Sequence, residues 1–452
     1  MSFPRYPKYR ASGVEWLGEV PERWEVRRAR AIGAFTASGI DKKIVEGEKP
    51  VKMFNYLDVY QSTDKTLRYS TDLMDTTAPQ DKVTEHSVRN GDILLTPSSE
   101  TADDIGHAAR VLDVPTGVVY SYHQLRFRTN NIANPAFLTY CFNSAPMRSY
   151  FSSVCTGTTR MVLGRDDFKN APLAIPTLTE QAIIAAFLDR ETAKIDALVA
   201  EQRRLIDLLK EKRQAVISHV VTKGLNPHAP MKPSGVTWLG DVPEHWRVLR
   251  LKRVSPRISG RLVYQPAQYF VAEGVPFLMG NNVTERGVNW EDVRFVPEEV
   301  NRQFSQHALR ESDVITVRVG APGLTCVVPK EADGLNCGSL MIIRRSASFD
   351  SQWLSGVMNG FIVRSQIDLV QYGAAQEQIN ITDAVDFLIP TPPLVEQSAI
   401  AAFLNDKTAQ FDALSGEAQR SIDLLQERRN ALISAAVTGK IDVRGLLEIE
   451  AA

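Results

Sequence analysis

Two segments of the chain each occur twice, in the same order, and this duplication constrains the fold more than any other feature. Residues 12–28 read SGVEWLGEVPERWEVRR, and residues 234–250 read SGVTWLGDVPEHWRVLR. Residues 180–198 read EQAIIAAFLDRETAKIDAL, and residues 396–414 read EQSAIAAFLNDKTAQFDAL. Between these matched segments the two halves of the sequence hardly resemble each other. The pattern indicates one scaffold that presents two different binding domains.

The second repeated segment opens a long helical pattern in each half. Apolar residues recur every three, four or seven positions, as at Ile195, Leu198, Leu205, Leu209 and Val216, which is heptad spacing. We expect helices over 179–224 and 395–440, with Thr179 as the N-cap of the first. An apolar stripe is not stable against water alone, so we expect the two helices to bury their stripes against each other. A duplicated chain favours the antiparallel arrangement.

The regions before the helices contain short apolar runs separated by Gly, Pro, Asn and Asp, a pattern typical of strands and turns. We expect strands around 93–96, 117–122 and 125–129, and in the second half around 313–319, 324–328 and 339–343. A helical stretch closes each region, over 135–154 and 353–370. The predicted class is α+β, with homologous but diverged domains at 1–178 and 225–394, the two long helices, and a tail at 441–452.

Composition limits the classes of function that remain. The 452 residues carry a net charge of −1, so any nucleic-acid surface must be a local patch rather than the whole molecule. No apolar run approaches the roughly 20 residues that span a bilayer, and the N-terminus has no apolar signal segment. The four cysteines lack CxxC spacing and are expected to be ordinary reduced thiols. We therefore expect a cytoplasmic protein.

Signatures of catalysis are missing from the sequence. It contains no GxxxxGK[ST] phosphate loop, no GxGxxG dinucleotide motif and no HExxH zinc motif. The tetrapeptide that amino-methyltransferases use, Asn or Asp followed by Pro-Pro and an aromatic residue, is also missing. In a chain of this length the joint absence favours a binding protein over an enzyme.

Two basic runs are candidate contacts to DNA phosphates, which position a duplex without reading its sequence. The alternative is a solvated strand or loop face. The candidates in the first half are Arg27, Arg28 and Arg30, and those in the second half are Arg250, Lys252, Arg253, Arg257 and Arg261, in a run that begins at Arg247.

Polar loops supply candidates for contacts to base edges, because Arg pairs with guanine and Asn or Gln with adenine. Simple polar connections are the alternative. The candidates in the first half are Asn55, Asp58, Ser98, Ser99, Thr101, Thr158, Thr159 and Arg160. Those in the second half are Asn281, Asn282, Thr284, Arg318, Gln376, Gln378 and Asn380. The repeated pairs Trp16/Trp24 and Trp238/Trp246 are better explained by packing against the helix ends than by base stacking.

The chain resembles the specificity subunits of type I restriction–modification systems. The resemblance rests on WLGEVPERW and WLGDVPEHW, each opening a variable domain, and on IPTLTEQAIIAAFLDRETAKIDAL and IPTPPLVEQSAIAAFLNDKTAQFDAL, each opening a long helix. It extends from Ser12 to Lys440. One copy is moderately specific, whereas two copies in this order around dissimilar domains are highly specific.

The resemblance implies a function for each part. In that family each target-recognition domain reads one half of a split DNA site, and the antiparallel helices set their separation. Two modification subunits dock on the scaffold and methylate adenines with S-adenosylmethionine, and restriction subunits add ATP-driven translocation and cleavage with Mg²⁺. The specificity subunit holds no cofactor or metal and catalyses nothing. We expect an asymmetric site with half-sites about 10 bp apart, in a nucleoid-associated complex of a bacterium or archaeon.

Two other classes of function remain open from the residues themselves. A coiled-coil scaffold could carry domains that bind proteins or other ligands instead of DNA. A self-sufficient nuclease or methyltransferase is the third class, and the missing motifs count against it.

Overall fold

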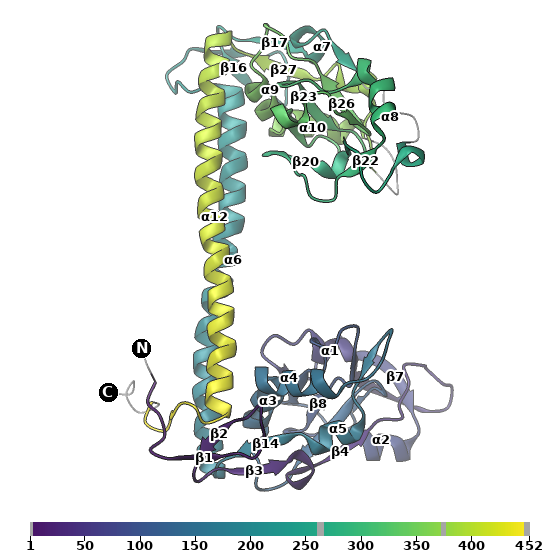
Figure 1. Ribbon diagram of the computed structural model, residues 1–452, viewed down its shortest axis with the longest axis vertical. Coiled ribbons are helices and arrows are strands. Elements are labelled where there is room, and N and C mark those ends of the chain that lie inside the picture. Colours follow the sequence, from purple (N-terminus) through teal and green to yellow (C-terminus); the bar gives the residue numbers. More distant parts are fainter. Residues whose placement is uncertain (1–2, 260–265, 372–376, 447–452) are drawn as a thin grey trace. The chain divides into compact units, whose positions relative to one another are not determined.

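The computed structural model describes residues 3–259, 266–371 and 377–446. The chain divides into two compact units, Met1–Gln202 with Arg420–Ala452, and Arg203–Gln419. Each unit contains one α+β domain and parts of both long helices, α6 (Leu178–Lys223) and α12 (Leu394–Val437) (Figure 1). No helix among the described residues is long and apolar enough to cross a membrane.

The long helices begin at positions that are set by local chemistry. The predicted N-cap Thr179 is wrong, because α6 already begins at Leu178. The Thr177 hydroxyl instead accepts a hydrogen bond from the amide of Glu180 (3.3 Å), as N-cap side chains do. The helices end next to Gly224 and Gly439, whose φ angles of 75° and 71° suit glycine at a helix C-terminus.

The two helices run antiparallel in each unit, as predicted. In the first unit the beginning of α6 packs against the end of α12, with Leu188 and Ile433 in one buried core. The Asp196 carboxylate of α6 also pairs with Arg429 of α12 (3.0 Å). In the second unit the end of α6 packs against the beginning of α12, with Val221 and Leu404 in one buried core.

The predicted apolar stripe is partly wrong in its positions. Leu198 and Leu205 are 51% and 42% exposed, and the matching Leu414 is 53% exposed. The predicted Leu209 is buried (8% exposed), and so is Val199 (8% exposed), which lies outside the predicted stripe. Adjacent helical positions point about 100° apart, so where the buried face includes Val199, the neighbouring Leu198 lies at its border with solvent.

The first α+β domain is built on two sheets. The larger has the order β4-β12-β8-β10-β6, and the smaller has the order β11-β5-β7. The bounds of the larger sheet are β4 Gly33–Ala37, β12 Leu125–Thr129, β8 Ile93–Leu95, β10 Ala108–Val111 and β6 Thr66–Leu67. Those of the smaller sheet are β11 Val119–Tyr120, β5 Lys49–Phe54 and β7 Met74–Ala78.

Three strand pairs and five helices complete this domain. The pairs are β1 (Tyr9–Ala11) with β2 (Glu19–Pro21), β3 (Glu25–Arg28) with β14 (Pro172–Ile175), and β9 (Ser98–Ser99) with β13 (Met161–Val162). The helices are α1 Tyr56–Tyr60, α2 Gln80–His86, α3 Pro135–Asn143, α4 Ala145–Val154 and α5 Arg165–Asn170.

The second α+β domain has sheets of order β18-β26-β23-β24 and β22-β19-β25. Their strands are β18 Ile258–Ser259, β26 Leu340–Ile343, β23 Val314–Val317, β24 Thr325–Val327, β22 Arg294–Val296, β19 Val275–Leu278 and β25 Asn336–Cys337. Its strand pairs are β15 (Met231–Pro233) with β16 (Asp241–Pro243), β17 (Arg247–Arg250) with β27 (Leu388–Thr391), and β20 (Val283–Thr284) with β21 (Gly287–Val288). Its helices are α7 Leu251–Val254, α8 Glu298–Gln303, α9 Ser351–Met358, α10 Phe361–Val370 and α11 Ile381–Ala384.

The two domains share their strand pairing although their sequences differ. The strand β5 pairs in parallel with β11, and β19 pairs in parallel with β25. The central β12 lies between β4 and β8, and β26 lies between β18 and β23 in the same antiparallel sense. The predicted homology of the domains is thus visible in their topology, and the predicted strands near residues 93, 125, 314 and 340 are present.

The predicted closing helices are each two helices rather than one. The break between α3 and α4 falls at Ser144, because Pro146 favours the first turn of a new helix. The break between α9 and α10 falls at Asn359 and Gly360. Within the domains all four cysteines are free thiols.

A buried tryptophan fixes the first domain to the ends of both long helices. The indole N–H of Trp24 donates to the carboxylate of Glu180 in the first turn of α6 (3.2 Å), and the Tyr6 hydroxyl donates to the same carboxylate (2.8 Å). The Trp24 ring also lies against Gly439, where α12 ends. We call Trp24, Glu180 and Gly439 the first anchor.

The second unit contains the same arrangement. The indole N–H of Trp246 donates to Glu396 in the first turn of α12 (3.1 Å), and the imidazole of His245 is 2.7 Å from the same carboxylate. The Trp246 ring lies against Gly224, where α6 ends. These residues form the second anchor. The prediction that Trp24 and Trp246 pack against the helix ends is confirmed.

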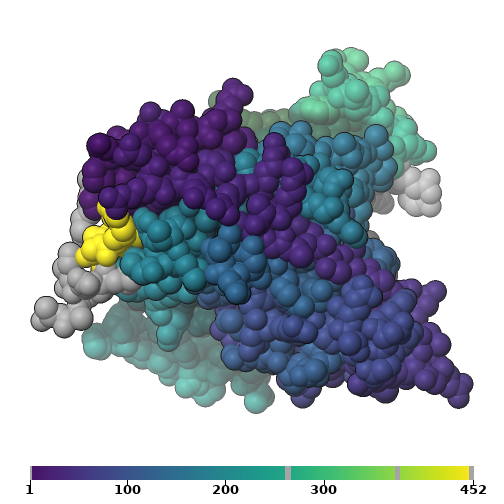
Figure 2. Space-filling view, turned by 90° about the horizontal axis from the view of Figure 1, so that it is seen from below, coloured from purple at the N-terminus to yellow at the C-terminus, as the bar shows by residue number. Residues whose placement is uncertain are grey.

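Figure 2 shows the N-terminal segment in purple beside the yellow segment that follows α12. The Tyr9 hydroxyl donates to the Gly439 carbonyl (3.0 Å), and the amide of Asp442 donates to the Pro4 carbonyl (2.8 Å). The guanidinium of Arg444 lies 4.8 Å from the centre of the Tyr6 ring. Residues at opposite ends of the chain therefore complete the first unit together.

Gly439→Ala tests the first anchor. A Cβ atom there would overlap the Pro21 ring and lie 3.3 Å from Trp24, in addition to straining a positive φ angle. We expect a loss of about 2–4 kcal/mol in the free energy of unfolding, measured by denaturant titration. Gly13→Ala is the control, because Gly13 also has a positive φ but no atom within 4 Å of its added Cβ. Equal losses in the two variants would contradict the packing role.

Leu209→Asp and Leu205→Asp test the position of the helix seam. Burial of an unpaired charge at Leu209 is expected to cost several kcal/mol and to lower the melting temperature by several degrees. The charge at the more exposed Leu205 remains hydrated and should have a much smaller effect. A larger loss for Leu205→Asp than for Leu209→Asp would contradict the burial of Leu209 in the seam.

Candidate nucleic-acid interface

Three predicted segments of the first domain converge at one place. The strand β13 pairs with β9, which brings the loop of residues 157–160 beside Ser98 and Ser99. The guanidinium of Arg160 donates to the Ser98 hydroxyl (3.2 Å) and lies 5.9 Å from the centre of the Tyr56 ring. The Tyr56 hydroxyl in turn donates to the Ser98 carbonyl (3.0 Å). We call residues 55–58, 98–101 and 157–160 the first loop cluster.

The positions of the side chains in the first loop cluster suit contact with a large ligand. Thr101, Thr158, Thr159 and Arg160 are exposed, whereas Ser99 is buried. Burial raises the pKa of Tyr56, so its hydroxyl keeps the proton that it donates to Ser98. Arg160 is thus held by Ser98 and by the Tyr56 ring, while its guanidinium stays exposed to solvent.

Tyr56 was not among the residues predicted to contact DNA. Its ring stacks on Tyr60 with 5.7 Å between centroids, and the Tyr60 hydroxyl donates to Asp104 (2.7 Å). The Asp104 carboxylate also lies 2.8 Å from the ring nitrogen of His107. The only signal available in advance was that Tyr56 adjoins a candidate residue, Asn55.

Two residues of the first domain that were predicted to contact bases are used by the fold. The side-chain Oδ1 of Asn55 accepts from the backbone N–H of Tyr56 (2.7 Å), and the Asp58 carboxylate accepts from the backbone N–H of Asn55 (2.6 Å). These bonds cap the first turn of α1, as Asn and Asp commonly do. Both side chains thus serve the fold, and base contact by Asn55 or Asp58 stays a prediction.

A second loop cluster lies at the matching place in the second domain. Gln378 forms an isolated antiparallel bridge with Val319, next to Arg318, whose guanidinium donates to the Ile379 carbonyl (3.3 Å). The turn before Asn281 approaches the same strand, because a Cβ atom on Gly280 would lie 3.1 Å from Val317. The second loop cluster comprises residues 280–284, 318–320 and 377–380. It corresponds to the first cluster in position but not in sequence.

Asn282 is a wrong prediction within the second loop cluster. Its side chain is fully buried, accepts from the Met279 amide (2.9 Å) and donates to the carbonyls of Asn289 (3.1 Å) and Glu291 (3.2 Å). Asn281 is exposed, and Thr284, Gln378 and Asn380 are partly exposed, so these remain candidates. Gln376 and Arg261 lie outside the described residues.

The two basic runs do not join the loop clusters. Arg27 and Arg28 are on β3, which pairs with β14, and Figure 1 shows both strands on the opposite side of the first domain from α1. Arg27 pairs with Glu25 (2.6 Å), and Arg28 and Arg30 donate to the carbonyl and side chain of Asn170. The first basic run therefore lies on a different surface of the domain from the first loop cluster.

Part of the second basic run is neutralised by an acidic residue from a distant part of the sequence. Arg250 and Lys252 both pair with the carboxylate of Asp386, at 2.8 and 2.6 Å. No acidic residue lies between Arg247 and Tyr269 in the sequence, so the pairing comes entirely from the fold. Arg253 and Arg257 are exposed and have no carboxylate partner within the described ranges. Phosphate contact by these residues stays a prediction.

A buried ion pair supports the strand that leads to each loop cluster. Asp92 is 2% exposed, sits just before β8 and accepts two hydrogen bonds from Arg128 of β12 (both 2.7 Å). Asp313 is 1% exposed, sits just before β23 and accepts from Arg344 (2.6 Å). Removing one partner of a buried pair costs about 3–5 kcal/mol, so these pairs hold both strands in register.

Comparison with known proteins places these features in context. Residues 21–206 match the family described as type I restriction modification DNA specificity domain. The chain is 26% identical over 435 residues to the MjaVIII specificity subunit of Methanocaldococcus jannaschii, covering 94% of this chain and 95% of the relative. It is 21% identical to the EcoKI specificity subunit of Escherichia coli K12, covering 94% and 90%.

Solved structures share the fold. One is a chain from a study of complex assembly and conformational transition in the type I R-M system, with TM-score 0.70 and 19% identity over 92% of this chain and 98% of the other. Another is the HsdS subunit from Thermoanaerobacter tengcongensis, with TM-score 0.53 and 18% identity over 93% and 98%. At these identities the likeness concerns the fold alone.

Arg160→Ala tests the first loop cluster. Loss of the guanidinium is expected to weaken binding to a specific duplex by about 1–3 kcal/mol, or roughly 5- to 150-fold. Fluorescence anisotropy at fixed salt gives the dissociation constant. Arg165→Ala is the control, because Arg165 is an exposed arginine on α5 outside the cluster. If both variants bind like the unaltered chain, Arg160 does not contact DNA.

Proposed function

Because residues 21–206 match the type I restriction modification DNA specificity domain and known specificity subunits align with most of the chain, we propose that this chain gives a type I restriction–modification complex its DNA sequence specificity and catalyses no reaction itself. Each target-recognition domain reads one half of a bipartite DNA site. The observation that carries this proposal is the pair of loop clusters, which occupy matching places on two domains of one topology.

The residues of the two loop clusters differ, so we propose that the two half-sites differ as well. Arg160 with exposed threonines favours one pattern of hydrogen bonds to base edges, and Asn281 with Gln378 favours another. The recognised site is then asymmetric, with half-sites near one helical turn apart, about 10 bp.

We propose that the paired long helices dock two modification subunits. Both helices carry exposed leucines, which a docked subunit would remove from water. They are Leu198, Leu205 and Leu208 on α6, and Leu414 and Leu424 on α12, which are 42–65% exposed.

The chemistry belongs to the partner subunits in this proposal. The modification subunits bind S-adenosylmethionine and flip adenine out of the duplex, which costs a few kcal/mol. Restriction subunits supply ATP- and Mg²⁺-dependent steps. Two clamped half-sites help to hold the strained duplex. We expect the complex to work on cytoplasmic, nucleoid-associated DNA of a bacterium or archaeon.

A domain replacement tests the function. Residues 30–170 are exchanged for those of another family member, which leaves the β3–β14 pair and the first anchor in place. Single-molecule methylome sequencing of cells that carry the chain with its modification subunit should show a split methyl-adenine motif. We expect the exchange to alter one half of that motif and to leave the other half unchanged.

The unaltered chain and cells without it serve as controls. A motif that is present without the chain would remove the specificity role. A replacement that changes both half-sites, or neither, would contradict one domain reading one half-site.

A further inference from the structure

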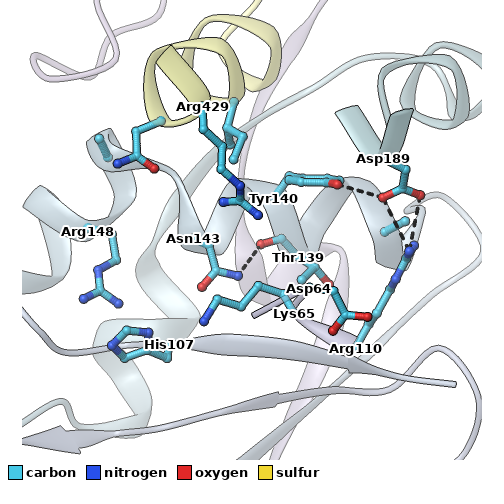
Figure 3. A pocket seen from close by; sticks show the side chains of 14 residues that line it. Asp64, Lys65, His107, Arg110, Thr139, Tyr140, Asn143, Arg148, Asp189 and Arg429 are labelled. Carbon is cyan, nitrogen blue, oxygen red and sulfur yellow. Dashed lines mark hydrogen bonds and ion pairs between the residues drawn. The ribbon is translucent and has the colours of Figure 1, made fainter. Parts of the chain in front are cut away.

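A pocket of about 420 Å³ opens in the first unit where the α+β domain meets the two long helices. Figure 3 shows its side chains converging from separate elements, with Lys65 beside β6, Arg148 on α4 and Arg429 on α12. None of the residues that were predicted to contact DNA lines this pocket. It is therefore a feature separate from the first loop cluster.

The pocket holds more positive charge than its acidic residues neutralise. Arg429 pairs with Asp196 (3.0 Å), and Arg148 pairs with Asp104 (3.3 Å). The ammonium of Lys65 has no hydrogen bond or ion pair with any described residue. Burial lowers the pKa of Lys65, and the nearby Arg148 and Arg429 lower it further. The three cations repel one another in a partly desolvated space.

The remaining carboxylates of the pocket are engaged elsewhere. Asp189 accepts hydrogen bonds from the Tyr140 hydroxyl (2.7 Å) and from Arg110 (3.2 Å). Asp64 pairs with Arg68 (3.1 Å) outside the pocket. Neither carboxylate is therefore available to Lys65. Burial and the neighbouring Arg148 also lower the pKa of His107 to about 4, so this imidazole is neutral at pH 7.

In the second unit, the arginine that corresponds to Arg429 pairs with a carboxylate of the α+β domain. Residues 211–218 read EKRQAVIS and residues 427–434 read ERRNALIS, so Arg213 of α6 occupies the place of Arg429 in α12. Arg213 pairs with the carboxylate of Glu285, which the β20–β21 hairpin extends from the domain to the helix. The adjacent Arg286 pairs with Asp412 of α12 (2.5 Å).

The matching aspartate in the first unit has a different partner. Asp196 occupies the place of Asp412 in the repeated segment, and it pairs directly with Arg429. No domain carboxylate among the described residues reaches Arg429 as Glu285 reaches Arg213. The first unit therefore has a cationic pocket where the second unit has an acidic side chain of its own.

We propose that this pocket binds a phosphate group through Lys65, Arg429 and Arg148. A phosphate offers several acceptor oxygens to donors that approach from three elements, whereas a single carboxylate offers only two. The bound group links the domain to α12 as Glu285 links the second domain to α6. The phosphate comes either from free inorganic phosphate or a phosphate ester, or from the backbone of DNA.

Titration of the full chain with inorganic phosphate, followed by calorimetry, tests the proposal. Saturable one-to-one binding with a dissociation constant of about 1 mM or below is expected. Lys65→Met keeps the length of the side chain and should weaken binding about tenfold or more, and Lys65→Arg should restore it. Lys210→Met is the matched control, since it removes one charge from an exposed helical site that does not line the pocket.

A second arm with duplex DNA distinguishes the two sources of phosphate. If the pocket takes a backbone phosphate, DNA displaces inorganic phosphate, and Lys65→Met reduces the slope of log affinity against log salt by about one. If it takes a free phosphate, DNA and phosphate bind together and the salt slope is unchanged. The phosphate arm needs no DNA, so it can succeed or fail independently of the proposed function.

The proposal is overturned if Lys65→Met changes neither phosphate binding nor the salt slope for DNA. It is also overturned if Lys210→Met lowers both as much as Lys65→Met does. Circular dichroism melts of each variant show whether the chain is folded, and Lys65→Arg retains the charge if Lys65→Met is unstable.

Discussion

The hydrogen bond between a buried tryptophan and the glutamate that opens a long helix is the interaction on which each unit depends. Trp24 and Glu180 form it in the first unit, and Trp246 and Glu396 form it in the second. A nearly buried carboxylate is tolerated only where donors and the helix N-terminus compensate for its lost hydration. The same indole packs against the glycine that ends the other helix. One side chain therefore fixes the domain, the start of one helix and the end of its neighbour.

This arrangement separates the residues that maintain the fold from the residues that can differ between the two domains. The anchors, the β3–β14 and β17–β27 pairs and the buried Asp92–Arg128 and Asp313–Arg344 pairs hold each domain in register. The loop clusters lie beyond these elements, at the far ends of the strands, and their exposed side chains do not contribute to the buried core. Their residues can differ between the two domains without loss of the fold, as a protein that reads two different half-sites requires.

The two units also differ where domain and helix meet. The second unit spans that junction with Glu285 and Arg286 from the β20–β21 hairpin, whereas the first leaves a cationic pocket around Lys65. Arg213 and Arg429 occupy equal places in the repeat, so the helices alone do not explain the difference. It arises in the diverged domains, which shows that divergence reaches beyond the loop clusters to the contacts with the scaffold.

The sequence by itself determined the duplication, the α+β class, the two long helices and their antiparallel pairing. Repeated motifs and heptad spacing are patterns among neighbouring residues, so they can be recognised without knowledge of contacts between distant segments. Only the tertiary structure decided which side chains are available for recognition. Asn55, Asp58 and Asn282 are candidates for base contact in the sequence, but their side chains cap turns in the fold. Asp386 neutralises part of a basic run that lies more than a hundred residues away in the sequence. Leu205 likewise fits the heptad and yet faces solvent. Side-chain partners and burial depend on contacts between distant segments, and a linear pattern carries no information about those distances.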